Sequence, residues 1–114
     1  MLGVLKANGF GMKEIEVIAK TNDLRVRIMM LEPRETSDWH YHTEVTDHIF
    51  CLQGTILVRM QAPEKEARLV PGARCLVEIR RVHQLENLED FEVSYLLIQG
   101  VGKYDFKSLT QGTK

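Results

Sequence analysis

The chain has 114 residues, which is room for one compact domain, so we predict that residues 1–114 form a single domain. Hydrophobic residues make up 44% and charged residues 27% of the sequence, which is typical of a folded globular protein and excludes global disorder. Fifteen basic residues against 16 acidic ones leave a net charge of −1, which argues against a nucleic-acid-binding protein. No apolar run approaches the ~20 residues of a membrane span. We therefore expect neither nucleic acid nor a membrane as a partner.

Two N-terminal segments are predicted as strands. Residues 15–20 alternate apolar and charged side chains apart from one position, and residues 24–30 alternate apart from Met29. A turn is expected at residues 21–23, where asparagine and aspartate can bond to their own backbone. The second segment places Arg25 and Arg27 on one face. Its other face is apolar and is expected to be the buried one: Leu24, Val26, Ile28 and Met30.

The middle of the chain contains two further predicted strands. Residues 48–52 and 55–60 flank the dipeptide Gln53-Gly54, which predicts a β-hairpin. The following segment, residues 62–67, is mostly polar and contains a proline, so it is predicted as a loop.

The remaining regular segments are also β-rich. Residues 75–79 and 92–99 are predicted strands, and residues 108–114 are polar and are expected to form a frayed tail. No segment shows a helical period longer than about three turns. Several short strands between turn signals indicate an all-β sandwich or barrel.

The cysteine content and the N-terminus indicate the compartment. Cys51 and Cys75 make no disulfide framework, so buried free thiols are the simpler interpretation, with one disulfide between them as the alternative. The N-terminus lacks a basic region followed by a long apolar stretch, which is the pattern of a secretory signal. We expect a cytoplasmic protein.

Three of the four histidines cluster between His40 and His48. His40 and His42 are two residues apart, so on a strand both imidazoles point to the same side and can share one ion. Such a pair also arises by chance. Taken alone, it is equally well explained by two solvated histidines on a strand.

The wider spacing around this pair carries more information. Residues 40–54 contain His-x-His, an acidic residue five positions later and a glycine seven further on. Residues 72–87 open with Gly72 and end with His83, three residues and Asn87. These two segments resemble the two-part signature of the cupin superfamily, and the resemblance covers roughly the central half of the chain.

The resemblance implies both a fold and a site. The fold is the all-β jelly roll, or double-stranded β-helix, of a small single-domain cupin of the RmlC-like type. The site is a metal centre inside the barrel, with His40, His42, His83 and Asp47 as ligands. Three imidazoles and a carboxylate suit one divalent transition metal, Fe, Mn, Ni, Zn or Cu, and leave two of six coordination positions open.

Three positions depart from the usual cupin pattern. Asp47 stands where glutamate is usual, so its carboxylate reaches one methylene less far, and a water bridge is the alternative to direct ligation. Arg34 stands in place of a glycine. Residues 78–80 replace a Pro-x-Gly turn.

Other polar residues near the motifs have two interpretations each. His48 has the opposite strand parity to Asp47 and is expected on the outer surface, with ligation as the alternative if Asp47 points away. Glu44 is expected to be a solvated charge. Arg80 and Arg81 are either a solvated pair or a clamp for a substrate carboxylate.

The resemblance also implies a function class. We expect a metal-dependent protein acting on a small molecule, either as a dioxygenase of an organic acid or as an isomerase or lyase. The alternative is a non-catalytic module that binds a small ligand or holds a metal for stability. Cupins are commonly dimers, so we expect a homodimer with the N-terminal strand, residues 1–20, in the contact.

Overall fold

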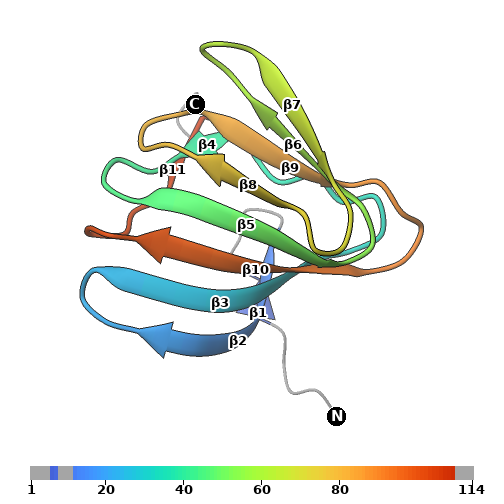
Figure 1. Ribbon diagram of the computed structural model, residues 1–114, viewed down its shortest axis with the longest axis horizontal. Coiled ribbons are helices and arrows are strands. Elements are labelled where there is room, and N and C mark those ends of the chain that lie inside the picture. The colour runs from blue at the N-terminus through green and yellow to red at the C-terminus, as the bar shows by residue number, and fades with distance from the viewer. Residues whose placement is uncertain (1–5, 8–11, 110–114) are drawn as a thin grey trace.

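The computed structural model describes residues 6–7 and 12–109, which form two antiparallel sheets packed face to face (Figure 1). The larger sheet has the spatial order β1 (Lys6–Ala7), β2 (Lys13–Lys20), β3 (Leu24–Leu31), β10 (Val93–Gly100), β5 (Thr46–Gln53) and β8 (Arg74–Val77). The smaller sheet has the order β11 (Lys107–Ser108), β4 (His40–Tyr41), β9 (His83–Asn87), β6 (Ile56–Met60) and β7 (Lys65–Leu69). The described residues contain no helix, so none that is long and apolar enough to cross a membrane. The all-β prediction is confirmed.

The core lies between the two sheets, where alternate side chains of each strand meet. Burial alternates without a break along β10 and along β6, as expected for strands with one face covered. The most deeply buried apolar side chains come from both sheets: Leu31, Ile49, Ile56, Val58, Val93 and Tyr95.

The turn at Gly54 joins the two sheets, so the predicted hairpin of residues 48–52 with 55–60 is wrong. β5 pairs with β10 and β8, whereas β6 pairs with β7 and β9. Gly54 has a φ of 83°, and a side chain there would clash with Val93. The glycine therefore marks a turn, as predicted, but the turn takes the chain from one sheet to the other.

The two faces of β3 are the reverse of the prediction. Arg27 is 6% exposed and faces the barrel interior together with Met29 and Leu31. Ile28, on the opposite face, is only half-buried. The alternation located the strand correctly, but the rule that charged side chains face solvent fails here because the interior of the barrel is polar at one end.

Of the smaller sheet only β6 matches a predicted strand, and the two longest strands that were not predicted are β7 and β9. β7 begins at Lys65, within the segment predicted as a loop, and it is an edge strand with mostly exposed side chains and so no apolar alternation. β9 carries polar residues at two of its three buried positions, His83 and Asn87. Both strands lack the alternating apolar pattern that identified β6.

The chain termini carried two further expectations. Ser108 lies in β11, paired with His40, and is therefore not part of a frayed tail. Residues 110–114 of that tail lie outside the described residues, as do residues 1–5 and 8–11 of the N-terminal strand.

Cys51 and Cys75 are both free thiols, so the alternative of a disulfide between them is wrong.

Candidate metal centre

Four predicted residues meet inside one end of the barrel. His40 lies on β4, His42 follows that strand by one residue, Asp47 lies on β5 and His83 begins β9. His40 pairs directly with His83 across the antiparallel β4–β9 ladder. All four side chains are buried, and one ligand atom from each lies within 4.8 Å of the others. The two-residue spacing does place both imidazoles of the pair on one face, as predicted.

The backbone fixes the orientation of all three imidazole rings. His40 Nδ1 lies 2.8 Å from the Asp38 carbonyl oxygen, and His83 Nδ1 lies 2.9 Å from that of Arg81. His42 Nδ1 is 2.6 Å from the carbonyl oxygen of Asp105. A ring that donates its Nδ1–H in this way keeps a lone pair on Nε2, which is the arrangement found in metal-binding histidines. Three Nε2 lone pairs are therefore available to the centre.

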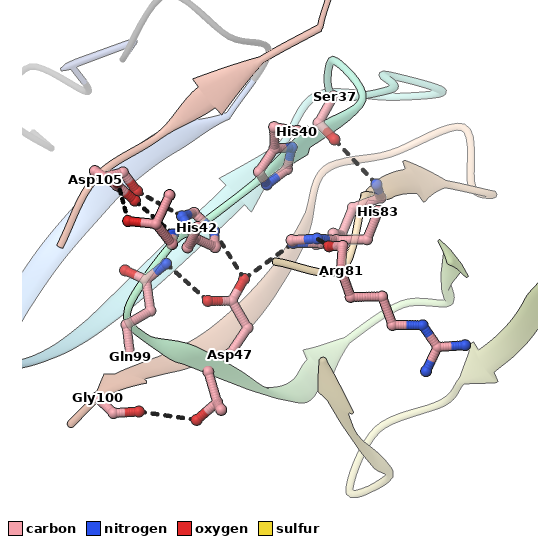
Figure 2. A network of polar contacts seen from close by, with 12 residues as sticks. Ser37, His40, His42, Asp47, Arg81, His83, Gln99, Gly100 and Asp105 are labelled. Atoms are coloured by element: carbon pink, nitrogen blue, oxygen red, sulfur yellow. Dashed lines mark hydrogen bonds and ion pairs between the residues drawn. The ribbon is translucent and has the colours of Figure 1, made fainter. Parts of the chain in front are cut away.

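Asp47 reaches the centre despite being one methylene shorter than glutamate. Its Oδ2 atom lies 3.1 Å from His83 Nε2 and 3.2 Å from His42 Nε2. Its Oδ1 atom accepts a hydrogen bond of 2.9 Å from Gln99 Nε2 (Figure 2). Because Gln99 holds one oxygen, the other oxygen is aimed at the histidines. Asp47 therefore faces the cluster directly.

The electrostatics of the cluster follow from burial and from this carboxylate. Burial, together with the neighbouring His83, lowers the pKa of His40 to about 3, so its ring is neutral at neutral pH. Burial raises the pKa of Asp47, but the facing imidazoles of His42 and His83 outweigh it and hold that pKa below its ordinary value. Burial likewise lowers the pKa of His42, and the Asp47 carboxylate outweighs it and raises that pKa overall. The centre thus attracts positive charge.

This geometry fits a metal ion. In the tautomer set by the backbone, His42 Nε2 has no hydrogen-bond partner among the described residues although it is only 3.2 Å from Asp47 Oδ2. Two lone pairs that face each other at this distance repel unless a proton or a metal cation lies between them. Three nitrogens and one oxygen form a donor set suited to first-row transition metals. The buried cluster of His40, His42, Asp47 and His83 fits a metal site.

Two aromatic residues that follow β10 cover the centre. The Phe106 ring stacks on the His40 ring with centroids 4.3 Å apart and an interplanar angle of 14°. The Tyr104 ring lies 5.6 Å from the His42 ring. Behind them the cavity has a volume of about 10 Å³, which is room for about one water molecule. Little free space therefore remains beside the four buried side chains.

Several polar residues near the motifs lie outside the cluster, as expected. His48 is half-buried on the outer face of β5 and is not part of the cluster, so the surface interpretation is the right one. Glu44 is exposed, as expected of a solvated charge.

The carboxylate clamp, which was one of the two interpretations of Arg80 and Arg81, is wrong. Arg81 donates hydrogen bonds to the carbonyl oxygens of Gln61 and Pro63 and forms an ion pair with Glu78. Its guanidinium therefore stabilises a surface turn. Arg80 is exposed, Arg81 is half-buried, and neither arginine lines the cavity of the centre. The pair is therefore a surface feature.

Four residues of the site were missed by the sequence analysis. Gln99, Arg27, Tyr104 and Phe106 line the cavity beside the histidines. Arg27 Nη2 donates a 2.5 Å hydrogen bond to Gln99 Oε1, and Gln99 in turn holds Asp47. For Gln99 and Arg27 the only indication in the sequence was their position on the inward-facing side of β10 and β3. Because both side chains are polar, that side was expected to face solvent.

A family model for the cupin domain matches residues 27–99. The chain belongs to the cupin family. Among curated proteins none matches it. Solved structures similar to this cupin include an uncharacterized conserved protein with a double-stranded β-helix domain from Klebsiella pneumoniae, at 20% identity and a TM-score of 0.73, covering 92% of this chain and 84% of that chain.

Two further similar structures have named activities. A sugar phosphate isomerase of the cupin superfamily from Silicibacter pomeroyi has 17% identity and a TM-score of 0.68, covering 88% of this chain and 78% of that chain. An oxalate oxidase has 13% identity and a TM-score of 0.79, covering 95% of this chain and 61% of that chain. At these identities the likeness shows the fold alone, which is the double-stranded β-helix.

Proposed function

We propose that this cupin binds one divalent transition metal ion through His40, His42, His83 and Asp47 and acts with it on a small molecule. The observation that carries the proposal is that all three histidines donate Nδ1–H to backbone carbonyls, while the Nε2 atoms of His42 and His83 face one carboxylate oxygen of Asp47. If the histidines served only as hydrogen-bonded core residues, each ring could adopt either tautomer. An ion that is shared through the Nε2 atoms requires this one.

The proposed chemistry is that of an ion with open positions. Four protein ligands leave two positions of an octahedral ion, where the metal can polarise a substrate oxygen or bind dioxygen. The protein residues orient the ligands and exclude water. A dioxygenase of a small organic acid and an isomerase or lyase both fit, and the similar folds include an oxalate oxidase and a sugar phosphate isomerase.

A second candidate is a non-catalytic module in which the metal serves binding or stability. The small cavity of about 10 Å³ favours it, because little room remains beside the centre. Water proton relaxation in the Mn²⁺-loaded protein separates the two. A high relaxivity, which shows rapidly exchanging water on the ion, supports an enzyme with open coordination positions. A relaxivity no higher than that of a buried ion without exchangeable water supports the non-catalytic module.

Elemental analysis of protein purified without a metal-affinity column tests the proposal. We expect about one transition-metal ion per chain in the wild type and almost none in His42→Ala, because this substitution removes a direct ligand. His48→Ala is the matched control, since it removes a histidine from the other face of β5. Wild-type protein without stoichiometric metal would overturn the proposal, and so would equal loss in both variants.

We also propose that two copies pair through the outer face of the larger sheet. Leu52 on β5 and Leu76 on β8 are 45% and 48% exposed on that face. Light scattering during gel filtration should give twice the chain mass for the wild type and the single mass for Leu52→Lys. Phe91→Lys, which changes an exposed apolar residue on the β9–β10 loop, should remain a dimer.

A cytoplasmic location is part of the same proposal. Neither Cys51 nor Cys75 is in a disulfide, as is usual in a reducing compartment. A fluorescent fusion found throughout the cytoplasm is the expected result. Recovery of the protein from a secreted or periplasmic fraction would contradict it.

A further inference from the structure

Arg27 places a cationic group inside the barrel where the core itself has no need of one. Its side chain is buried and lines the cavity that contains His40, His42 and Asp47. One end of the guanidinium is engaged, since Nη2 bonds Gln99 and Nη1 lies 3.3 Å from Glu14 Oε1. The Nε atom has no hydrogen-bond partner among the described residues. A buried guanidinium with an unpaired N–H costs stability, because the lost hydration is not replaced.

A second polar atom in the same cavity is also without a partner. Tyr95 is fully buried, and within the described part of the chain its hydroxyl bonds to nothing. Tyr95 faces Met29 across the β3–β10 ladder, and Arg27 is the next residue of β3 on the same inner face. The two side chains are thus diagonal neighbours, close enough for long side chains to share a ligand. Unpaired buried polar atoms are rare in folded proteins, and two that line one cavity indicate a ligand.

The space next to this cavity is also positively charged. A basin of about 250 Å³ adjoins the inner cavity and shares Tyr104 and Gln99 with it. Its lining includes Lys20, Arg25 and Lys103, and no acidic side chain is among the described residues that line it. Such a basin raises the local concentration of anions and repels cations.

Tyr104 separates the basin from the inner cavity. Its ring lies under the guanidinium of Arg25, with the Cζ atom 4.1 Å from the ring centroid. It belongs to an irregular segment between β10 and β11, without strand pairing of its own. Since the inner cavity holds only about one water molecule, a larger ligand would need more space, which a displacement of this ring would provide by joining the two cavities.

We propose that Arg27 and Tyr95 form the subsite that binds the carboxylate of a small anionic ligand beside the metal centre. A carboxylate matches both groups, because its oxygens accept from the Arg27 Nε–H and from the Tyr95 hydroxyl. Gln99 ties the subsite to Asp47, so the bound carboxylate lies one amide group away from the ligand cluster. The inference rests on the proposed function and specifies its substrate class as small carboxylates.

Calorimetric titration of the metal-loaded protein with glycolate and with glycolamide tests the subsite, because the two probes differ by one charge and little in size. Wild-type protein should bind glycolate at least about 10-fold more tightly than glycolamide. Arg27→Gln should lose about 10-fold or more in glycolate affinity and most of the discrimination. Arg68→Gln is the matched control, since it removes an exposed arginine of β7 and should leave both affinities unchanged.

Tyr95→Phe keeps the test decisive if Arg27→Gln disturbs the site, because it removes one unpaired hydroxyl and leaves the Gln99–Asp47 bond intact. Its glycolate affinity should fall about 3-fold to 10-fold. Its melting temperature without glycolate should not fall, since no hydrogen bond within the described residues is lost. Wild-type glycolate affinity in both Arg27→Gln and Tyr95→Phe would overturn the subsite.

The two proposals fail in different ways. Wild-type protein that holds no metal overturns the proposed function before any probe is added. Protein that holds metal but binds glycolate and glycolamide equally overturns the carboxylate subsite alone.

Discussion

The two ends of the barrel interior are built from the same three strands but differ in chemistry. At one end the inward-facing residues of β3, β5 and β10 are Arg27, Asp47 and Gln99, and Gln99 is the register partner of Asp47. At the other end β3 and β10 contribute Leu31 and Val93, which also face each other. A strand can therefore change from polar to apolar along one inner face. The apolar end stabilises the fold, whereas the polar end costs stability and positions a site.

The largest effect is expected at the apolar end. Leu31 is fully buried, so Leu31→Ala leaves a cavity and should lower the free energy of unfolding by about 2–5 kcal/mol in urea denaturation. The affinity of the folded protein for its metal should hardly change, because no group of the polar end is touched. A large loss of metal affinity with little loss of stability would contradict this division between the two ends.

A smaller effect is expected from Gln99→Met at the polar end. This change frees Asp47 Oδ1 from its amide partner and so loosens the carboxylate that faces the histidines. Metal affinity should fall by about 10-fold to 100-fold, as is typical for residues that orient ligands, and competition with a chelator measures it. Gln84→Met, on the outward face of β9, is the matched control. Equal affinity in both variants would show that Gln99 does not position Asp47.

The smallest effect is expected on the surface, away from both ends. Arg34 and Asp90 form an ion pair of 2.9 Å, but their side chains are 60% and 85% exposed. Asp90→Asn should therefore change the free energy of unfolding by less than about 1 kcal/mol, measured by urea denaturation. A larger loss would mean that surface charge, and not the apolar end, supports this part of the fold.

The sequence predicted the metal cluster better than it predicted the surroundings of the cluster. His40, His42, Asp47 and His83 were found because their spacing is local within each motif and the family resemblance links the two motifs. Gln99 and Arg27 were missed because their roles depend on strand pairing between residues 72 positions apart. Such contacts leave no local pattern in the sequence.

The strand errors have the same physical origin. Alternation along β3 identified two faces but not which one is inside, since both faces carry apolar residues and the inner face also carries Arg27. The pair of strands around Gly54 was read as a hairpin because a short turn between apolar runs is usually one. The jelly roll uses that turn to change sheets, and only the pairing of the other strands reveals it.

Thermal unfolding with and without metal tests the central claim, that the polar end is built to hold an ion. An ion that binds only the folded chain, at about 100 times its dissociation constant, should stabilise the wild type by about 2.7 kcal/mol and raise its melting temperature by roughly 10 °C. His48→Ala should show the same rise, and His83→Ala should show none. Wild-type protein whose melting temperature is unaffected by Fe²⁺, Mn²⁺, Ni²⁺, Zn²⁺ and Cu²⁺ would contradict the account.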